Sequence, residues 1–338
     1  MRDALRGFGI LGINRRNISY AMKWNDRRHY PLVDDKIATK RLCEGAGIPV
    51  PRLLAVAHHH FEMRGLLAAL ADRDSFVLKP ARGAMGNGIL VVMERKGDGF
   101  LSSAGREYSS DQFLYHASGI ISGLYSLAGR ADAAMVEERV RIDLSLARMS
   151  PAGVPDIRVI VYRGVPVMAM LRLPTRRSGA RANLHQGAIG VGVDLVTGIT
   201  RHAVMRGAPI RENPDSGEEV IGRKIQGISQ VLEIAVAAAD ETGLGYLGAD
   251  VVIDARSGPM ILELNARPGL TIQLANAAGL RPRLEAVDAR LGWPHGDPER
   301  RLPVAERVAL GQEIVDTVTR GAGRGQRLAR SLWDSEPS

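Results

Sequence analysis

The sequence GADVVIDARSGPMILELNARPG, residues 248–269, decides how the rest of the chain is interpreted. Two apolar runs, 249–253 and 260–264, flank Ala-Arg-Ser-Gly, which has the composition of a turn, so the pattern predicts a β-hairpin. A hairpin centred on this turn has three facing pairs: Asp254 with Pro259, Val252 with Ile261, and Asp250 with Glu263. Because side chains alternate along a strand, Asn265 shares the face of Glu263. Three oxygen-bearing side chains are therefore expected on one patch.

This patch favours a metal site. Two carboxylates side by side on neighbouring strands repel each other, and a divalent cation offsets that repulsion. Mg²⁺ takes oxygen ligands from a few carboxylates and from substrate phosphates. We therefore predict that Asp250, Glu263 and Asn265 bind Mg²⁺, with Mn²⁺ as an alternative ion. The competing interpretation is a solvated hairpin face, although Val252 and Ile261 would add apolar side chains to it.

A second unusual stretch, VLKPARGAMGNG at residues 77–88, joins a lysine at a strand end to a glycine-rich loop. Glycines let backbone N–H groups approach an anion, and Lys79 supplies a positive charge, so the stretch indicates a phosphate-binding flap. It is not a Walker A loop, because the lysine precedes the glycines, and it opens no helix as a dinucleotide-binding loop does. A plain β-hairpin is the alternative, since Asn87-Gly88 is itself a strong hairpin-turn signal.

Hydrophobic periodicity predicts a mixed order of helices and strands without an internal repeat. Helices are expected from Asp34 or Asp35 to about Gly45, and over 60–72, 109–129, 222–242 and 304–320. Strands are expected at 76–79, 89–92, 134–140, 157–162 and 165–171, besides the hairpin. Residues 1–33 are interpreted as basic and irregular, 172–193 as a loop, and the chain from about 282 as polar with a disordered end. This order indicates an α+β fold rather than a regular alternation of strands and helices.

The composition of the 338 residues indicates a folded protein of about two domains. The net charge of +8 favours an anionic partner such as a nucleotide, a nucleic acid, an acidic substrate or a membrane surface. Only 4% of residues are aromatic and none alternates with basic residues, so nucleic-acid binding is not expected. A single cysteine, Cys43, and the lack of a signal-peptide pattern or a long apolar run predict a cytoplasmic location.

Six segments together resemble the ATP-grasp superfamily, and within it the branch of alpha-L-glutamate ligases that add glutamate to a ribosomal protein. They occur in family order between about residues 34 and 271: DDKIATKRLCEGAGIPVP, FVLKPARGAMGNGI, MVEERV, DIRVIVYRGVPVMAMLR, RANLHQG and GADVVIDARSGPMILELNARPGL. The resemblance implies an ATP-grasp fold, in which two α+β subdomains hold the nucleotide between them. The expected division is a basic segment 1–33, an N-subdomain with the flap at 34–135, a C-subdomain with the metal site at 136–281, and a C-terminal helix with a basic tail at 282–338.

The resemblance also implies roles by position. Contacts to the nucleotide phosphates would come from Lys36 and Lys79, under a flap that includes Gly83, Gly86, Asn87 and Gly88. The adenine edge would be contacted by the strand residues Glu137, Glu138, Arg139 and Val140, and the ribose by Asp156 or, because the preceding loop is long, by Asp143. The transferred phosphoryl group would be surrounded by Arg158, Arg172, Arg181 and Asn183, with Mg²⁺ at Asp250, Glu263 and Asn265.

The implied activity is ATP- and Mg²⁺-dependent ligation of a carboxylate to an amine through an acyl phosphate, with glutamate or another amino acid added to an acidic or peptide substrate. Two alternatives stay open: an ATP-grasp small-molecule kinase, and a nucleotide-binding regulatory module without turnover. Only 35 residues precede Lys36, where the family usually carries a separate α/β domain. The substrate is therefore expected to be held by the remaining loops, by residues 1–33, by the C-terminal tail or by another protein.

Four further features of the sequence can be interpreted as structural or as functional. Histidines 58–60 are adjacent and so do not point at one centre, which favours a solvated loop over a metal site. His185, inside the NLHQG segment, either contacts a substrate carboxylate or is structural. Cys43 is expected to be a small buried residue on the first long helix. The basic tail is expected to be solvated, with an acidic or protein partner as the alternative.

Overall fold

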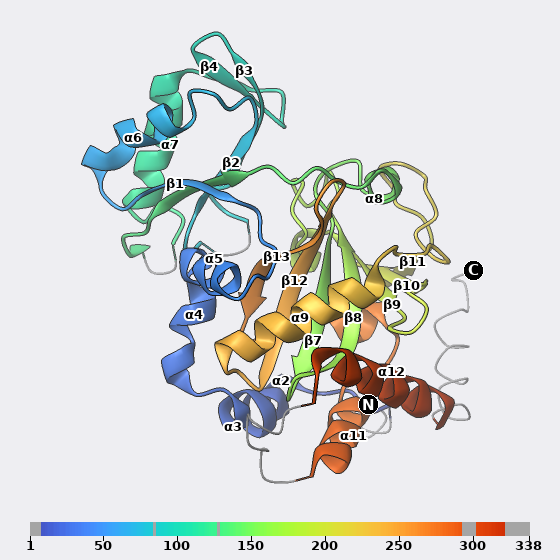
Figure 1. Ribbon diagram of the computed structural model, residues 1–338. Coiled ribbons are helices and arrows are strands. Elements are labelled where there is room, and N and C mark those ends of the chain that lie inside the picture. The colour runs from blue at the N-terminus through green and yellow to red at the C-terminus, as the bar shows by residue number, and fades with distance from the viewer. Residues whose placement is uncertain (1–7, 84–85, 127–128, 293–301, 322–338) are drawn as a thin grey trace.

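Two antiparallel sheets organise the protein, whose computed structural model describes residues 8–83, 86–126, 129–292 and 302–321 (Figure 1). Sheet A has six strands in the order β1-β6-β2-β3-β4-β5: β1 (Leu53–Ala57), β2 (Phe76–Pro80), β3 (Leu90–Lys96), β4 (Gly99–Ser102), β5 (Glu107–Tyr108) and β6 (Ala134–Glu138). Sheet B has seven strands in the order β11-β10-β9-β8-β7-β12-β13: β7 (Asp156–Tyr162), β8 (Val165–Leu173), β9 (Ile189–Val193), β10 (Thr200–Met205), β11 (Ala208–Ile210), β12 (Tyr246–Asp254) and β13 (Gly258–Asn265). The predicted α+β class is confirmed.

Sheet A is covered on one face by α6 (Met63–Ala69) and α7 (Ser110–Ile121) (Figure 1). The ring of Phe76 meets those of Phe100 and Phe113 edge-on, with centroids 5.3 and 5.8 Å apart, which fixes α7 on the sheet. The helix predicted over 109–129 ends at Ile121, because the chain turns sharply at Gly123. There φ is +83°, and a Cβ would lie only 2.4 Å from the carbonyl oxygen of Arg130.

The two faces of sheet B pack against different helices. One face carries α9 (Ile228–Thr242), which starts after Gly227 rather than at the predicted residue 222 because Gly227 has φ +72°. The opposite face carries α10 (Ile272–Ala275), α11 (Arg281–Leu291) and the N-terminal helices. The helix predicted at 304–320 is confirmed as α12 (Val304–Gly321), which packs along β8. Across the described ranges, none of the helices combines the length and apolar character that crossing a bilayer requires.

The described part of the N-terminal segment, from residue 8, is largely helical, which corrects the prediction of an irregular stretch. It contains α2 (Ile13–Arg15), a π-helical turn (Arg16–Ala21), α3 (Met22–Trp24), a 3₁₀ turn (Arg27–His29) and α4 (Pro31–Asp34). The rings of Tyr20 and Trp24 lie 5.4 and 5.9 Å from the ring of Tyr162 on β7. Asn25 ties the segment to β12, because its amide donates to the carbonyl of Tyr246 (2.7 Å) and accepts from the same residue's N–H (2.9 Å). Apolar packing on sheet B, which periodicity alone did not indicate, therefore orders this segment.

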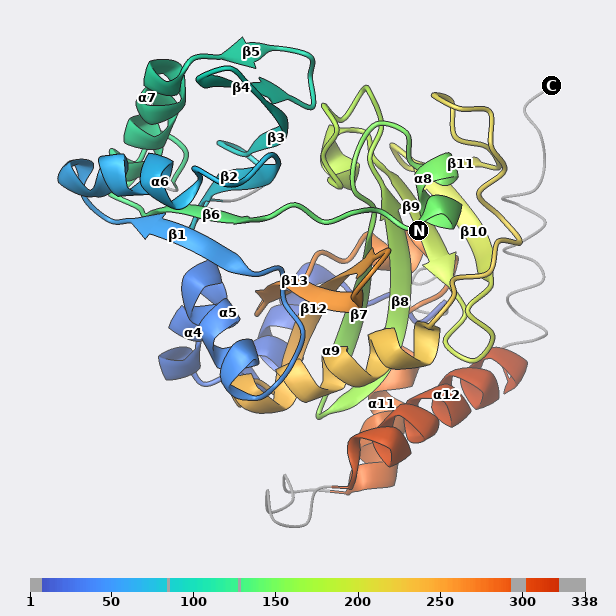
Figure 2. The same cartoon turned by 45° about the horizontal axis from the view of Figure 1, so that its top comes forward.

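The helix predicted to start at Asp34 or Asp35 lies where the two sheets meet. It is α5 (Lys36–Gly45), and the carboxylate of Asp35 caps it by accepting from the N–H groups of Ile37 and Ala38 at 2.9 and 3.2 Å. Both views place α5 below β1 and close to β13 (Figure 1, Figure 2). Side chains on α5 can therefore reach both sheets.

The hairpin of residues 248–265 forms with an irregular register. Asp250 pairs with Glu263 as predicted, but Val251 pairs with Ile261, so a bulge at this point leaves Leu262 as an extra residue on β13. The predicted pairs of Asp254 with Pro259 and of Val252 with Ile261 are therefore wrong by one residue. Asp254 instead faces Gly258. Its carboxylate sets this turn by accepting from the N–H groups of residues 256 and 257, both at 2.9 Å.

Other differences concern elements with weak patterns. The sequence predicts a loop over 172–193, but β8 extends to Leu173 and β9 begins at Ile189, while β10, β11, α11 and the short helix α8 (Leu144–Met149) were not predicted. The predicted turn between β7 and β8 is confirmed, with φ +52° at Arg163 and +76° at Gly164. The four-part division of the chain stays a prediction, and residues 322–338 of its tail lie outside the described residues.

Candidate functional site

A patch of charged side chains lies on the face of sheet B opposite α9. The register places Glu263, Asp250 and Arg158 directly opposite one another on β13, β12 and β7. Two residues along β7, Asp156 lies opposite Arg172 of β8. Directly opposite residues of antiparallel strands point to the same face. These five residues are called the charged patch below.

Two arginines neutralise the central carboxylate of this patch. Arg158 binds Asp250 through two hydrogen bonds, Nε to Oδ1 at 2.7 Å and Nη2 to Oδ2 at 2.6 Å. Arg172 binds Asp156 in the same way at 2.5 and 2.7 Å, and its Nη2 also lies 2.7 Å from Oδ2 of Asp250. We predicted a metal cation because Asp250 and Glu263 repel each other. The two arginines already offset this repulsion at Asp250, so the repulsion by itself does not require a metal ion.

Burial and the arginines have opposite effects on the two aspartates. Burial acts to raise the pKa of Asp250, but Arg158 and Arg172 together hold this pKa below its ordinary value. At Asp156, burial prevails over the attraction of Arg172, and repulsion from Asp250 adds to it, so the pKa rises to about 6. Asp250 is therefore a permanently ionised anchor at neutral pH, whereas Asp156 changes charge closer to neutrality.

The three predicted metal ligands lie together on one face of the hairpin, and their role in binding a cation stays a prediction. Glu263 faces Asp250, and the amide Nδ2 of Asn265 lies 3.2 Å from Oδ2 of Asp250. The side chain of Glu263 is 35% exposed and pairs only loosely with Nζ of Lys36, at 3.7 Å. Among the residues that the structure describes, Oδ2 of Asp250 has three donors, whereas Oδ1 has one, Arg158, and keeps a lone pair. Within the described ranges no three His, Cys, Asp or Glu side chains cluster for a metal, so a cation here would depend on Asn265 as well.

Lys79 lies one residue before the end of β2, which extends past the predicted end to Pro80, and its ammonium belongs to a buried ion cluster. Nζ of Lys79 lies 2.5 Å from Oε1 of Glu137, and Nζ of Lys40 lies 2.8 Å from Oε2. All three side chains are at most 5% exposed. Burial acts to raise the pKa of Glu137, but Lys79 and Lys40 outweigh it and hold the pKa below its ordinary value. The side chain of Glu137 thus orients Lys79, a role separate from the predicted backbone contact with adenine.

Lys40 is a site residue that the sequence analysis missed. It also donates to the carbonyl of Pro51, so its ammonium bridges α5, β6 and the segment before β1. The signal that could have identified it is its spacing, because Lys40 follows Lys36 by four residues on one helix and therefore lies on the same helix face.

The glycine-rich loop is fixed at both ends. At its start, Lys36 donates to the carbonyl of Gly83 at 2.8 Å, and both carboxylate oxygens of Asp132 accept from the N–H of Arg82 at 3.0 Å. At its end, a ring nitrogen of His116 lies 2.9 Å from the carbonyl oxygen of Gly88. A Cβ on Gly88 would lie 2.6 Å from the ring of Tyr125, so this position requires glycine. The described ends of the loop, residues 82–83 and 86–88 with Asn87 in the last turn, are therefore held in place by specific contacts between β2 and β3.

Gly86 brings the end of this loop against the segment that joins β8 to β9 in sheet B. A Cβ on Gly86 would lie 3.0 Å from Cδ of Arg181, which belongs to the segment between β8 and β9. Lys36 makes a second connection, since its ammonium contacts Gly83 in the loop and Glu263 in the charged patch. The two halves predicted to enclose a phosphate chain therefore face each other.

The other predicted site residues have local partners. The carboxylate of Glu138 lies 3.7 Å from Arg73, and its backbone N–H donates to the carbonyl of Arg52 at 2.9 Å. Val140 is buried against β12 and β13, and Nε of Arg139 is buried without a hydrogen-bond partner among the described residues. Asn183 accepts from the N–H of His185 at 3.0 Å. The adenine and phosphoryl contacts stay predictions.

The choice of ribose contact also stays a prediction. Asp143 accepts from the N–H of Ser145 at 2.9 Å and so caps α8, whereas both oxygens of Asp156 accept from Arg172. The adjacent histidines diverge: the ring of His59 stacks on that of Phe61 at 5.5 Å, and the ring of His60 lies 3.2 Å from the hydroxyl of Ser118.

Cys43 is buried on α5, and burial raises the pKa of its thiol to about 11. Only the thiolate reacts readily with disulfide reagents, so native protein at pH 8 is expected to label at least about 100 times more slowly than denatured protein. The absorbance released by Ellman's reagent measures this directly. Labelling at equal rates in native and denatured protein would contradict the buried position.

Residues 15–289 match the family described as sugar-transfer associated ATP-grasp. The chain belongs to this family. The predicted ATP-grasp resemblance, based on six ordered segments, is therefore confirmed over most of the chain. The ATP-grasp fold agrees with the two α+β halves that meet at α5.

Two relatives of the ATP-grasp protein carry the name that the sequence segments suggested. A probable alpha-L-glutamate ligase of Enterobacter sp. (strain 638) is 25% identical over 267 residues, which cover 79% of this chain and 64% of that protein. Another probable alpha-L-glutamate ligase, from Thioalkalivibrio sulfidiphilus (strain HL-EbGR7), is 24% identical over 292 residues, which cover 86% of this chain and 72% of that protein. The chain thus spans roughly two thirds of the length of these relatives. Among solved structures, the ATP-grasp ligase PsnB with its minimal precursor is 16% identical, has a TM-score of 0.43, and is matched over 80% of this chain and 63% of PsnB.

Proposed function

We propose that this protein is an ATP- and Mg²⁺-dependent carboxylate–amine ligase that adds glutamate or another amino acid to an acidic or peptide substrate. The observation that carries the proposal is the position of Lys36, whose ammonium contacts both the root of the glycine loop and Glu263. A phosphate chain bound there has backbone N–H groups on one side and cation-binding carboxylates on the other. The names of the two relatives support the same activity.

The proposed reaction has two balanced steps. A carboxylate oxygen attacks the γ-phosphorus of ATP, the new O–P bond replaces the bond to ADP, and ADP leaves. The amine nitrogen then attacks the carbonyl carbon of the acyl phosphate, the C–O bond to phosphate breaks, phosphate leaves, and the nitrogen loses a proton. Phosphoryl transfer requires positioning and charge neutralisation more than covalent participation of the protein.

The proposed roles follow from how the residues are held. Arg158 and Arg172 are fixed by Asp250 and Asp156, so their guanidinium groups need no reorganisation to stabilise the transferring phosphoryl group. Arg181 and Asn183 approach from the segment under the loop. Mg²⁺ or Mn²⁺ bound by Glu263, Asp250 and Asn265 would neutralise phosphate oxygens. Lys36 and Lys79 would bind the phosphates, and the 137–140 backbone and Asp156 or Asp143 the nucleoside.

The same proposal includes the cytoplasmic location and the partners. A single buried thiol with a raised pKa needs no oxidising compartment. The net charge of +8 favours an acidic peptide or protein partner, as expected for the basic N-terminal segment or the tail.

Hydroxylamine trapping tests the proposed function. With ATP, Mg²⁺ and a panel of amino acids, dipeptides and acidic peptides, a ligase is expected to release ADP and to form a hydroxamate, because hydroxylamine attacks the acyl phosphate. A small-molecule kinase would release ADP and give a stable phosphate ester without hydroxamate. A regulatory module would bind ATP without ADP release for any member of the panel. Either of the last two results contradicts the proposal.

Replacing Lys79 by Met is expected to raise the Kd for ATP by about 10- to 100-fold, because a charge-assisted contact to phosphate is lost while Glu137 keeps Lys40 as its counter-ion. Fluorescence titration with a labelled ATP measures the change. Lys96→Met is the matched control, since Lys96 forms an exposed pair with Glu107 on β3 and β5. Equal affinity in the Lys79 variant would reject the phosphate role.

A further inference from the structure

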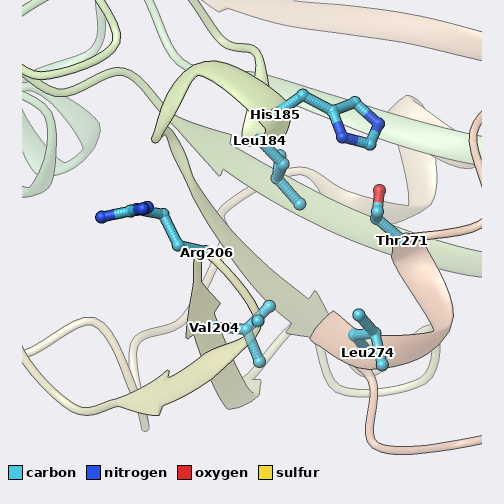
Figure 3. Close-up of a pocket in the computed structure, with 7 residues that line it drawn as sticks. Leu184, His185, Val204, Arg206, Thr271 and Leu274 are labelled. Atoms are coloured by element: carbon cyan, nitrogen blue, oxygen red, sulfur yellow. The ribbon is translucent and has the colours of Figure 1, made fainter.

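A small pocket lies beside the charged patch, under the β10–β11 hairpin. Its volume is about 240 Å³, and it is lined by Leu184, His185, Val204, Arg206, Gly207, Thr271 and Leu274 (Figure 3). Sites for drug-sized ligands and nucleotides measure roughly 300–1,000 Å³. A pocket of this size fits a single amino acid or the end of a peptide.

The strand register places the pocket on the face of sheet B that carries the charged patch. Val204 on β10 lies opposite Gly190 on β9, which lies opposite Arg172 on β8, which in turn lies opposite Asp156. Two strand spacings, about 10 Å in all, separate the backbone of Val204 from that of Arg172. A Cβ on Gly190 would lie 2.6 Å from Cδ2 of Leu184, so glycine here lets the pocket wall lie directly on the sheet. A single substrate molecule is therefore long enough to reach from the pocket to the charged patch.

The segment between β8 and β9 contributes both to the pocket and to the contact with the glycine-rich loop. Arg181 lies under Gly86, and Asn183 caps the turn that carries Leu184 and His185. A substrate bound in the pocket would therefore contact the turn that continues directly from the proposed phosphoryl-binding residues.

The lining combines an apolar centre with unused hydrogen-bond donors. Leu184, Val204 and Leu274 surround the middle, and His185 and Thr271 lie close together at one edge (Figure 3). None of the described residues that line the pocket is acidic. Within the described part of the chain, the side chains of His185, Thr271 and Arg206 make no hydrogen bond or ion pair. This set of donors matches an anionic group attached to a short apolar stem.

Arg206 supplies the cation. It occupies a two-residue turn with φ +55°, followed by Gly207 at +82°, and its guanidinium extends away from the other lining side chains (Figure 3). Because it is exposed and pairs with no described residue, a change of rotamer can bring it over the pocket without breaking an interaction.

We propose that this pocket binds the carboxylate that does not react, on an amino-acid or peptide substrate of the ligase. The inference rests on the proposed function, which assigns residues to ATP and the cation, and it adds residues that bind the substrate. The reacting carbonyl must lie at the arginines of the charged patch, so a carboxylate held about 10 Å away is not the one that reacts. Arg206, with His185 and Thr271, fixes that group, and the apolar side chains contact the stem.

Ligand binding without turnover tests the pocket. The probes are the twenty amino acids and their carboxamides, measured by saturation-transfer NMR in the presence of ADP. At least one amino acid is expected to bind, and its carboxamide about tenfold or more weakly, because the charge-assisted contact is lost. Arg206→Gln and Thr271→Val are expected to abolish this preference. Arg201→Gln, on β10 just before the turn that carries Arg206 but paired with Asp194, is the matched control. Failure of every probe to bind, or a preference unchanged in Arg206→Gln, would overturn the inference.

Turnover assays then distinguish the two substrates and the two proposals. If the pocket holds the amine component, Arg206→Gln raises the KM for that component while hydroxamate formation from the other stays at wild-type rate; if it holds the carboxylate component, hydroxamate formation falls as well. Carboxylate-dependent binding without any ADP release would remove the ligase activity and leave the pocket assignment standing. ADP release with wild-type kinetics in Arg206→Gln would remove the pocket assignment and leave the ligase activity standing.

Discussion

Glu263→Gln is expected to lower ATP-dependent turnover by about 10²- to 10³-fold while the fold stays intact, because it removes the most available oxygen ligand of the proposed cation site. Glu263 is suited to this test. Its side chain is 35% exposed and forms one loose pair with Lys36, so the amide is accommodated at a stability cost below about 0.5 kcal/mol. Asp250 is a poorer choice, since its replacement would leave Arg158 and Arg172 without their shared counter-ion.

The measurement has two parts. ADP release is followed against Mg²⁺ concentration, and binding of Mn²⁺ is followed by the loss of the free-ion electron paramagnetic resonance signal in the presence of ATP. Glu219→Gln, which removes an exposed partner of Arg211, serves as the control and is expected to change neither. Wild-type turnover and Mn²⁺ binding in Glu263→Gln would remove the metal assignment, whatever the reaction proves to be.

The hairpin illustrates how much of the site could be predicted from sequence. Alternation along each strand and a recognisable turn paired Asp250 with Glu263, which is the contact that matters, but this pair is correct because the bulge at Leu262 cancels a one-residue error in the predicted turn. The remaining pairs were wrong by one, because a bulge and the side chain of Asp254 reset the register between turn and site. Neither signal is readable from alternation alone.

Charge neutralisation was the less predictable property of the site. Sequence analysis placed Arg158 and Arg172 near the phosphoryl group, but only the cross-strand register shows that both bind Asp250. Likewise, Lys79 was identified from its position before the glycines, whereas its counter-ion Glu137 and the second lysine, Lys40, depend on how α5 packs beneath sheet A. These are long-range contacts, and no local periodicity specifies them.

One of the missed strands, β9, has a clear cause in its glycines. β9 is IGVGV and follows a loop rich in Arg and Gly, so glycine weakened its strand signal. Its glycines are required by tertiary contacts. A Cβ on Gly192 would lie 2.4 Å from the carbonyl oxygen of Ala275, and Gly190 lies beneath Leu184. Because α10 and Leu184 pack closely on this strand, its sequence needs glycines, and these glycines make it hard to recognise as a strand from sequence.

Glu137→Ala is expected to destabilise the protein by about 3–5 kcal/mol, because it leaves the ammonium groups of Lys40 and Lys79 buried without a counter-ion. Urea unfolding at pH 7 measures the loss. A smaller effect than about 1 kcal/mol would show that water or rearrangement already satisfies the lysines. The triple replacement Lys40→Met, Glu137→Leu, Lys79→Met is the matched control, since removing all three charges leaves no unpaired ion and is expected to recover most of the stability.

The pH dependence of this loss identifies its electrostatic origin. The pKa of Glu137 is held below its ordinary value of 4.5 in the folded state, so the carboxylate stabilises the fold at and above that pH and the contribution is lost as the pH falls through the folded-state pKa. The difference in unfolding free energy between the wild type and Glu137→Gln is therefore expected to be constant between pH 6 and 8 and to shrink below about pH 4.5. A difference that stays the same at low pH would assign the effect to packing, because a protonated glutamate and a glutamine have nearly the same shape and no net charge.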